Sequence, residues 1–95
     1  MVKSGNKMDP EKTIKINRKR VDKITYDIVK SIQSRDLAVK RINLAKKRQG
    51  LPMIDPKRER VVIKKARNAA ARLGVDPELA ENIMLMLIAH SRGLL

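Results

Sequence analysis

Cationic side chains recur inside an apolar stripe of this 95-residue chain, and this arrangement could do chemistry. Alternating steps of three and four residues select Arg18, Val21, Thr25, Ile28, Ile32, Arg35, Val39, Ile42 and Lys46. Five of these nine positions are aliphatic and three are cationic. An unpaired cation in such a seam is costly unless it snorkels to the edge or meets an anion. The spacing favours a site for an anionic ligand, with snorkelling as the alternative.

The spacing of these cations predicts a site that two chains share. Arg35 and Lys46 are eleven residues apart, so on a helix they share a face at a separation of about 16 Å. Arg18 and Arg35 are about 25 Å apart along the axis, too far for one small anion. A partner helix can deliver its own Arg18 to the far end of the site, so the site and a dimer imply each other.

Two later segments add polar candidates. Arg58 and Glu59 follow a helix start, and Arg58 begins the predicted inward stripe Arg58, Val62, Ala66, Ala69 and Leu73. Ser91 is the polar member of a third stripe, formed by Ala80, Met84, Leu87, Ser91 and Leu95. The alternatives are ordinary first-turn charge for Arg58 and Glu59, and for Ser91 a hydroxyl that bonds back to its own helix. His90 lies beside this stripe, and we assign it no role.

Composition removes several kinds of chemistry. The chain has no cysteine and one histidine, which excludes disulfides and thiol nucleophiles and leaves almost no material for a metal site or a Ser–His triad. We therefore expect no cofactor and no metal. The net charge of +13 predicts an anionic partner: nucleic acid, a membrane surface or a small metabolite. No apolar run reaches the roughly 18 residues of a membrane span, and no leader is visible, so we expect a cytoplasmic protein.

Start and stop signals predict an all-α fold of three helices, one long and two short. We expect a disordered tail over residues 1–12 and a helical domain over 13–95, in which the long helix runs from about Ile14 to Arg48. The two short helices begin at Asp55-Pro56 and Asp76-Pro77 and end before Gly74 and Gly93. A helix of about 52 Å overhangs a domain whose radius of gyration is about 12–13 Å. This length also predicts an obligate dimer.

Taken in order, these residues resemble the all-helical chorismate mutase family. The resemblance covers residues 14–95 and rests on Arg18, on Arg35 with Lys46 eleven residues later, and on two runs. The runs are Gly50-Leu-Pro-Met-Ile-Asp55-Pro-Lys-Arg58-Glu59-Arg60 and Ile88-Ala-His-Ser91-Arg. Each motif alone is weak, whereas their order and spacing together are specific.

The resemblance implies an intertwined all-α homodimer that converts chorismate to prephenate, the branch step toward phenylalanine and tyrosine. It implies that Arg18 of the partner chain closes the site and that Arg35 binds a substrate carboxylate. Lys46 would bind carboxylate and the ether oxygen of the breaking bond. The remaining implied contacts are positive charge from Arg58, the ring hydroxyl on Asp55 and Glu59, and a carboxylate on Ser91.

One departure from the family pattern concerns Leu95. Family members usually carry Gln or Glu at this position, four residues after Ser91, and its side chain donates a second hydrogen bond to the ether oxygen. Leucine cannot donate, and losing one such donor costs on the order of 10²–10³ in rate. The alternatives are a catalytically weak or non-catalytic relative, an isochorismate pyruvate lyase, and a small basic helical nucleic-acid-binding protein. The last does not explain cations inside an apolar seam.

Overall fold

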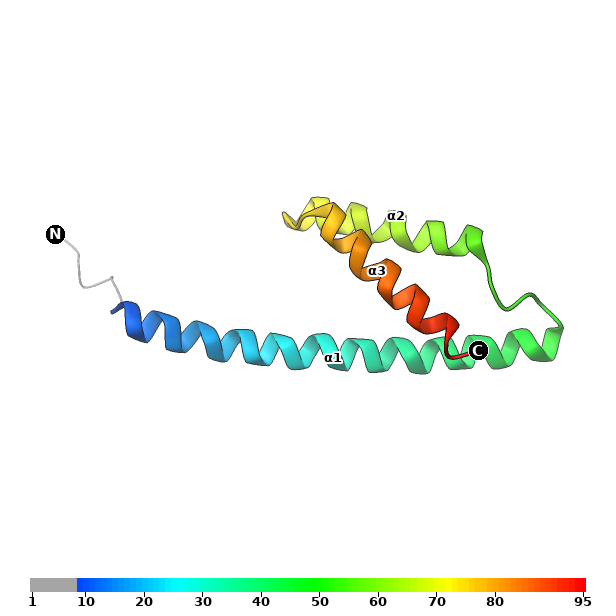
Figure 1. The fold of residues 1–95 in the computed structure, drawn as a ribbon, viewed down its shortest axis with the longest axis horizontal. Helices are drawn as coiled ribbons and strands as arrows, with labels where there is room; N and C mark the ends of the chain where they lie inside the picture. The colour runs from blue at the N-terminus through cyan, green and yellow to red at the C-terminus, as the bar shows by residue number, and fades with distance from the viewer. Residues whose placement is uncertain (1–8) are drawn as a thin grey trace. The chain divides into compact units, whose positions relative to one another are not determined.

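The computed structural model describes residues 9–95, and in this range the chain is helical with no strand (Figure 1). Helix α1 spans Pro10–Gln49, α2 spans Pro56–Leu73 and α3 spans Pro77–Arg92. The predicted all-α arrangement of one long and two short helices is therefore confirmed. The long helix begins earlier than expected, so residues 10–12 of the expected tail are helical, and residues 1–8 of that tail lie outside the described range.

All three helices begin at an Asp-Pro pair. The side chains of Asp9, Asp55 and Asp76 accept hydrogen bonds from backbone N–H groups of the first turns that follow, at 3.0, 3.1 and 3.0 Å. Proline fits the first helical position because that residue needs no N–H donor. Helix α2 ends at Gly74, which has a left-handed φ of 72° and donates its N–H to the Ala70 carbonyl. Glycine takes this conformation without the penalty of a Cβ atom.

The chain divides into two units after Arg35, and each is described by itself. In the described part of the first unit, residues 9–35, the whole segment from Pro10 onward belongs to α1. Ile32 is half-buried. The other larger apolar side chains of this segment are exposed: Ile14, Ile16, Val21, Ile24, Tyr26, Ile28 and Val29. This stretch therefore has an apolar surface that its own residues do not cover.

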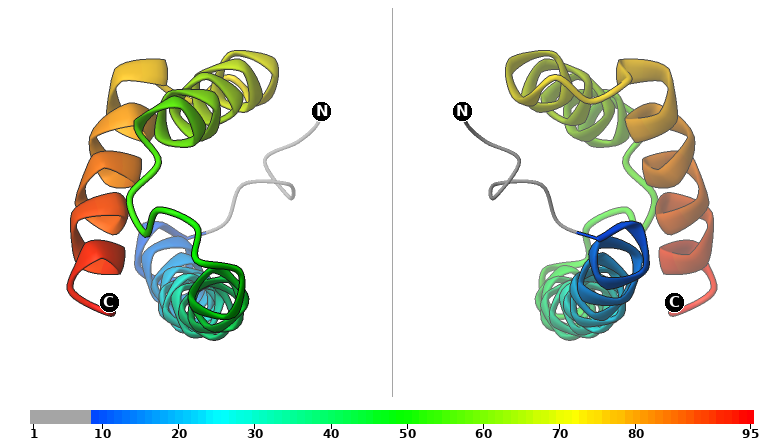
Figure 2. Two further views of the ribbon diagram at one scale, coloured as in Figure 1. Left: turned by 90° about the vertical axis from the view of Figure 1, so that its right-hand side faces the viewer. Right: turned by 90° about the vertical axis from the view of Figure 1, so that its left-hand side faces the viewer.

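The second unit, Asp36–Leu95, holds the last turns of α1 together with α2 and α3. Helices α2 and α3 pack against each other, and α3 leads from the turn at Gly74 back toward the last turns of α1 (Figures 1 and 2). His90 on α3 meets Asp36 on α1, with Nε2 at 3.0 and 3.1 Å from the two carboxylate oxygens. Ala70 and Ile88 are the buried apolar residues in the described range, and Asn43 is buried with them.

The inward stripes are partly as predicted. Val62, Ala66 and Ala69 on α2 and Ala80, Met84, Leu87 and Ser91 on α3 are half-buried. The predicted inward position of Leu73 is wrong: its side chain is 78% exposed because α2 ends there, and Ala70 is buried instead. The predicted inward position of Leu95 is wrong as well: this residue is 43% exposed because it lies beyond the end of α3.

Candidate active site

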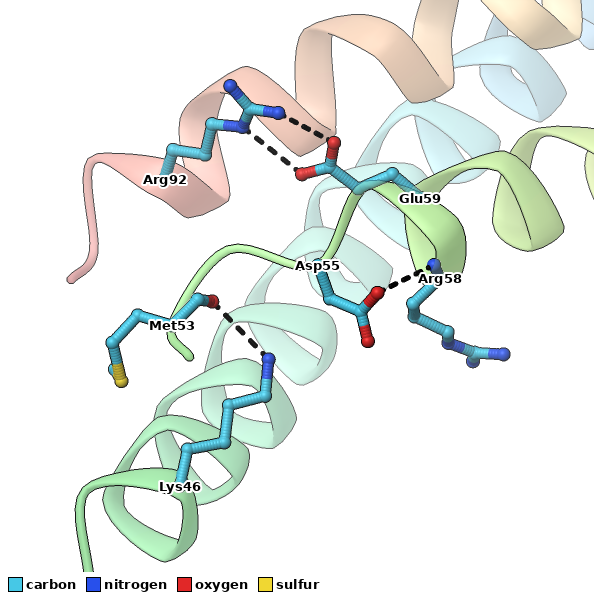
Figure 3. Close-up of polar contacts among 6 residues, drawn as sticks. All are labelled: Lys46, Met53, Asp55, Arg58, Glu59 and Arg92. Carbon is cyan, nitrogen blue, oxygen red and sulfur yellow. Dashed lines mark hydrogen bonds and ion pairs between the residues drawn. The ribbon is translucent and has the colours of Figure 1, made fainter. Parts of the chain in front are cut away.

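Lys46 is the cation that the structure places against the segment leading into α2. It projects from the last turns of α1, is half-buried, and donates from Nζ to the Met53 carbonyl oxygen at 3.3 Å (Figure 3). An ammonium group has three N–H donors, and this carbonyl accepts one of them. The contact holds the lysine beside the start of α2 and leaves it donors for a ligand.

Asp55 and Arg58 meet at the N-terminus of α2. The Asp55 carboxylate accepts the Arg58 backbone N–H through Oδ1 at 3.1 Å, so this carboxylate caps the positive end of the helix dipole. The expectation that the Arg58 side chain points toward the core is wrong within the single chain, where Arg58 is exposed. The covered face of α2 includes Glu59, Ile63 and Ala70, which places Arg58 at its edge. Figure 3 shows the guanidinium pointing away from Glu59.

Glu59 forms a two-pronged ion pair with Arg92, the last residue of α3. Arg92 Nε donates to Oε2 at 3.1 Å and Nη2 donates to Oε1 at 2.6 Å (Figure 3). The hydrogen bond from Arg92 is the main cause that lowers the pKa of the Glu59 carboxyl, and Lys46 contributes in the same direction through its charge. The same bond raises the pKa of Arg92. Glu59 is therefore a carboxylate near neutral pH, bonded to Arg92 and within the electrostatic influence of Lys46.

Sequence reasoning did not single out Arg92. A basic residue in the last turn of a helix is common because it complements the helix dipole, so its type and position carried no special signal. Its partner is 33 residues away in the sequence, and only the packing of α3 on α2 brings the two side chains together. The Asp36–His90 contact was missed for the same reason.

Ser91 lies in the last turn of α3 and Leu95 lies just beyond that helix, and the role expected of Ser91 stays a prediction. The Ser91 hydroxyl donates to the Leu87 carbonyl one turn earlier, at 2.8 Å, which is the structural alternative considered above. A hydroxyl has one proton to donate, so a contact from Ser91 to an anionic ligand requires this bond to open. Leu95 follows the end of α3, and its N–H donates to the Arg92 carbonyl at 3.3 Å.

The structure brings together part of the predicted site. Lys46, Asp55, Arg58 and Glu59 lie near one another in the second unit (Figure 3). Arg18 and Arg35 belong to the first unit, where Arg18 is exposed and Arg35 is half-buried. Their part in the site stays a prediction. Over residues 9–95 the side chains form no cluster of three or more His, Cys, Asp or Glu that could hold a metal ion.

An all-helical domain that holds a lysine and two carboxylates at a helix N-terminus is suited to a small, charged and hydroxylated ligand. The chain belongs to the chorismate mutase type II family, whose model matches residues 17–94. It is 32% identical over 77 residues to a chorismate mutase of Methanocaldococcus jannaschii, a match that covers 81% of this chain and 78% of that protein. No solved structure matches. Within residues 9–95 no helix has the length and apolar character that crossing a membrane requires.

Proposed function

We propose that the protein catalyses the Claisen rearrangement of chorismate to prephenate, the branch step toward phenylalanine and tyrosine, at sites shared between two chains. The observation that carries the proposal is the half-buried Lys46, held beside the carboxylates of Asp55 and Glu59 in a chain of the chorismate mutase type II family. The M. jannaschii relative, which bears that activity as its name, supports the same conclusion.

The reaction suits these residue types. A Claisen rearrangement is unimolecular and needs neither a nucleophile nor a proton transfer. The protein must hold a flexible dicarboxylate in its reactive conformer and stabilise negative charge that develops on the ether oxygen. Lys46 supplies the donor for that oxygen and for a carboxylate, while Arg35, with Arg18 from the partner chain, binds carboxylate. Asp55 and Glu59 accept the ring hydroxyl, Arg58 adds positive charge, and Ser91 assists with a carboxylate.

The uncovered part of α1 supports an intertwined homodimer. Ile14, Val21 and Ile28 recur every seven residues and are 50%, 58% and 57% exposed. This is the spacing of a helix seam that packs against another helix. Burying the exposed half of each side chain would stabilise the assembly by roughly 1 kcal/mol per residue. Arg18 lies between Ile14 and Val21 on the same stripe, so covering the stripe with a second chain also brings Arg18 to that chain.

The test is chorismate turnover by the purified protein, followed by subunit exchange between two inactive variants. Arg18→Ala and Arg35→Ala should each abolish turnover and leave a folded dimer. Their mixture should recover activity, because a heterodimer has one site with both arginines. The matched control is Arg20→Ala, which removes an exposed cation of α1 outside the stripe and should leave turnover close to wild type.

Two results would contradict the proposal. Absence of turnover by the wild-type dimer would argue against the activity. Turnover by the wild type with no recovery on subunit exchange would leave the activity intact and argue against a site shared between chains.

A further inference from the structure

We propose that Arg92 is a positioning residue for this reaction: it holds the Glu59 carboxylate in one orientation toward the ring hydroxyl of chorismate and cancels the charge that Glu59 would otherwise present to a dianion. This inference rests on the proposed function. It is carried by the two-pronged contact of Arg92 with Glu59, at 2.6 and 3.1 Å.

The geometry of the pair fixes the orientation of the Glu59 carboxylate and leaves it able to accept further hydrogen bonds. A guanidinium presents a planar fork of donors that matches both oxygens of a carboxylate, so the contact sets the rotation of the Glu59 group as well as its position. An ionised carboxylate has about four lone-pair sites, and Arg92 occupies two. Glu59 can therefore accept a hydrogen bond from a substrate hydroxyl while Arg92 still holds it.

The pair also joins the two elements that carry the predicted binding residues. Glu59 lies in the first turn of α2, four residues after Asp55, and Arg92 directly follows Ser91 in the last turn of α3. The side chain of Glu59 is 23% exposed and that of Arg92 is 48% exposed, so the carboxylate is the more enclosed partner. A contact between these turns fixes the end of α3 relative to the Asp55–Glu59 segment.

Charge gives Arg92 a second effect. Chorismate carries two carboxylates, and Asp55 and Glu59 are both acids at the place where its hydroxyl is proposed to bind. An isolated Glu59 would repel the substrate, whereas the Glu59–Arg92 pair is neutral as a whole. The hydrogen bond from Arg92 also lowers the pKa of Glu59, which keeps this group an acceptor as the solution becomes acidic.

The test compares Arg92→Gln with wild type in chorismate turnover across pH. The ring hydroxyl does not take part in bond making or breaking, so its contact binds substrate and transition state equally and appears in KM. We expect Arg92→Gln to raise KM on the order of 10-fold, the lower end of the worth of one hydrogen bond to a charged group, with kcat unchanged within about twofold. The acidic limb of kcat/KM should move to higher pH, and Arg92→Lys should return it toward wild type.

A matched control separates positioning from a structural contribution. Arg67 on α2 pairs with Glu81 on α3 at 3.0 Å, so Arg67→Gln removes another ion pair between the same two helices. It should leave both KM and the acidic limb unchanged. An Arg92→Gln protein with unchanged KM and an unmoved acidic limb would overturn the proposal. A double variant provides a second refuting outcome. If the losses of kcat/KM in Glu59→Gln and in Arg92→Gln multiply in the double variant, the two residues act independently, and Arg92 then binds the substrate without Glu59.

A carboxyl NMR titration of Glu59 provides a measurement that needs no turnover. In Arg92→Gln the pKa of Glu59 should rise toward its ordinary value, and in Arg67→Gln it should not. An unmoved Glu59 pKa would overturn the inference even in an active enzyme. A wild-type protein without chorismate turnover would instead overturn the proposed function, and the role of Arg92 in it, whatever the titration shows.

Discussion

Replacing Lys46 with methionine removes the donor that the proposed mechanism places at the breaking bond. A donor to an oxygen that becomes negative in the transition state is worth about 2.7–4 kcal/mol, so kcat should fall on the order of 10²–10³-fold. The folded state loses one hydrogen bond, the bond to the Met53 carbonyl at 3.3 Å, which is long for an N–H donor. It also loses the attraction between the Lys46 charge and the Glu59 carboxylate. Such a hydrogen bond contributes about 0.5–1 kcal/mol, so the thermal midpoint should fall by only about 2–8 °C. The catalytic loss should therefore far exceed the structural one.

The assay is the loss of chorismate absorbance with time, with thermal melting by circular dichroism on the same samples. Lys47→Met is the matched control, because it removes the neighbouring exposed cation and lowers the net charge by the same amount. It should keep kcat close to wild type. A Lys46→Met protein whose kcat stays within about tenfold of wild type would refute the assignment of Lys46 to the ether oxygen. Equal losses in both variants would point to overall charge instead.

Three further changes have distinct expected outcomes. Leu95→Gln should raise kcat by up to about 10²-fold if the new amide reaches the ether oxygen, and an unchanged kcat would show that this position does not face the reacting atoms. Asn43→Leu should stabilise the fold by about 1 kcal/mol, because the buried Nδ2 has no hydrogen-bond partner within residues 9–95; a lowered melting midpoint would show that the amide is paired in solution. The lowered pKa of Glu59 means that its stabilising contribution is present above the pKa of an unfolded glutamate and is lost as pH falls through the lowered value. Arg92→Gln should therefore unfold at a higher pH than wild type in an acid titration followed by circular dichroism, and coincident transitions would contradict this.

Helix boundaries could be predicted because they depend on neighbouring residues. Asp55-Pro56 and Asp76-Pro77 start α2 and α3, and Gly74 ends α2, as the local chemistry of caps predicts. The one misplaced boundary contained the same signal. Asp9-Pro10 starts α1 with its own side-chain cap, but the polar composition of the first residues was taken to indicate a tail.

The contacts of the site depend on packing and could be predicted only in part. Periodicity predicts an inward stripe of α2 that begins at Arg58. The middle members of that stripe are half-buried as predicted, whereas Arg58 and Leu73 at its two ends are exposed. A shift of one residue turns a helical side chain by about 100°, since a turn has 3.6 residues. The covered face extends one position further round the helix than the predicted stripe, so Glu59 lies against α3, where it meets Arg92, while Arg58 is exposed at the edge. Periodicity can identify an apolar face, but its centre is set by the helix that packs on it.

The pattern of burial along α1 suggests why cations occupy positions of its apolar stripe. Ile32 and Val39 are half-buried, whereas Val21 and Ile28 on the same stripe are exposed. Ile42, later on the same stripe, is 54% exposed as well. The chain by itself therefore leaves much of the stripe uncovered, and exposed apolar surface favours association. If a second copy covers the earlier part, Arg18 enters an apolar interface, where an unpaired cation is costly. An anionic substrate between the chains would remove that cost, so binding of chorismate should tighten the dimer, and the dimer in turn should tighten binding.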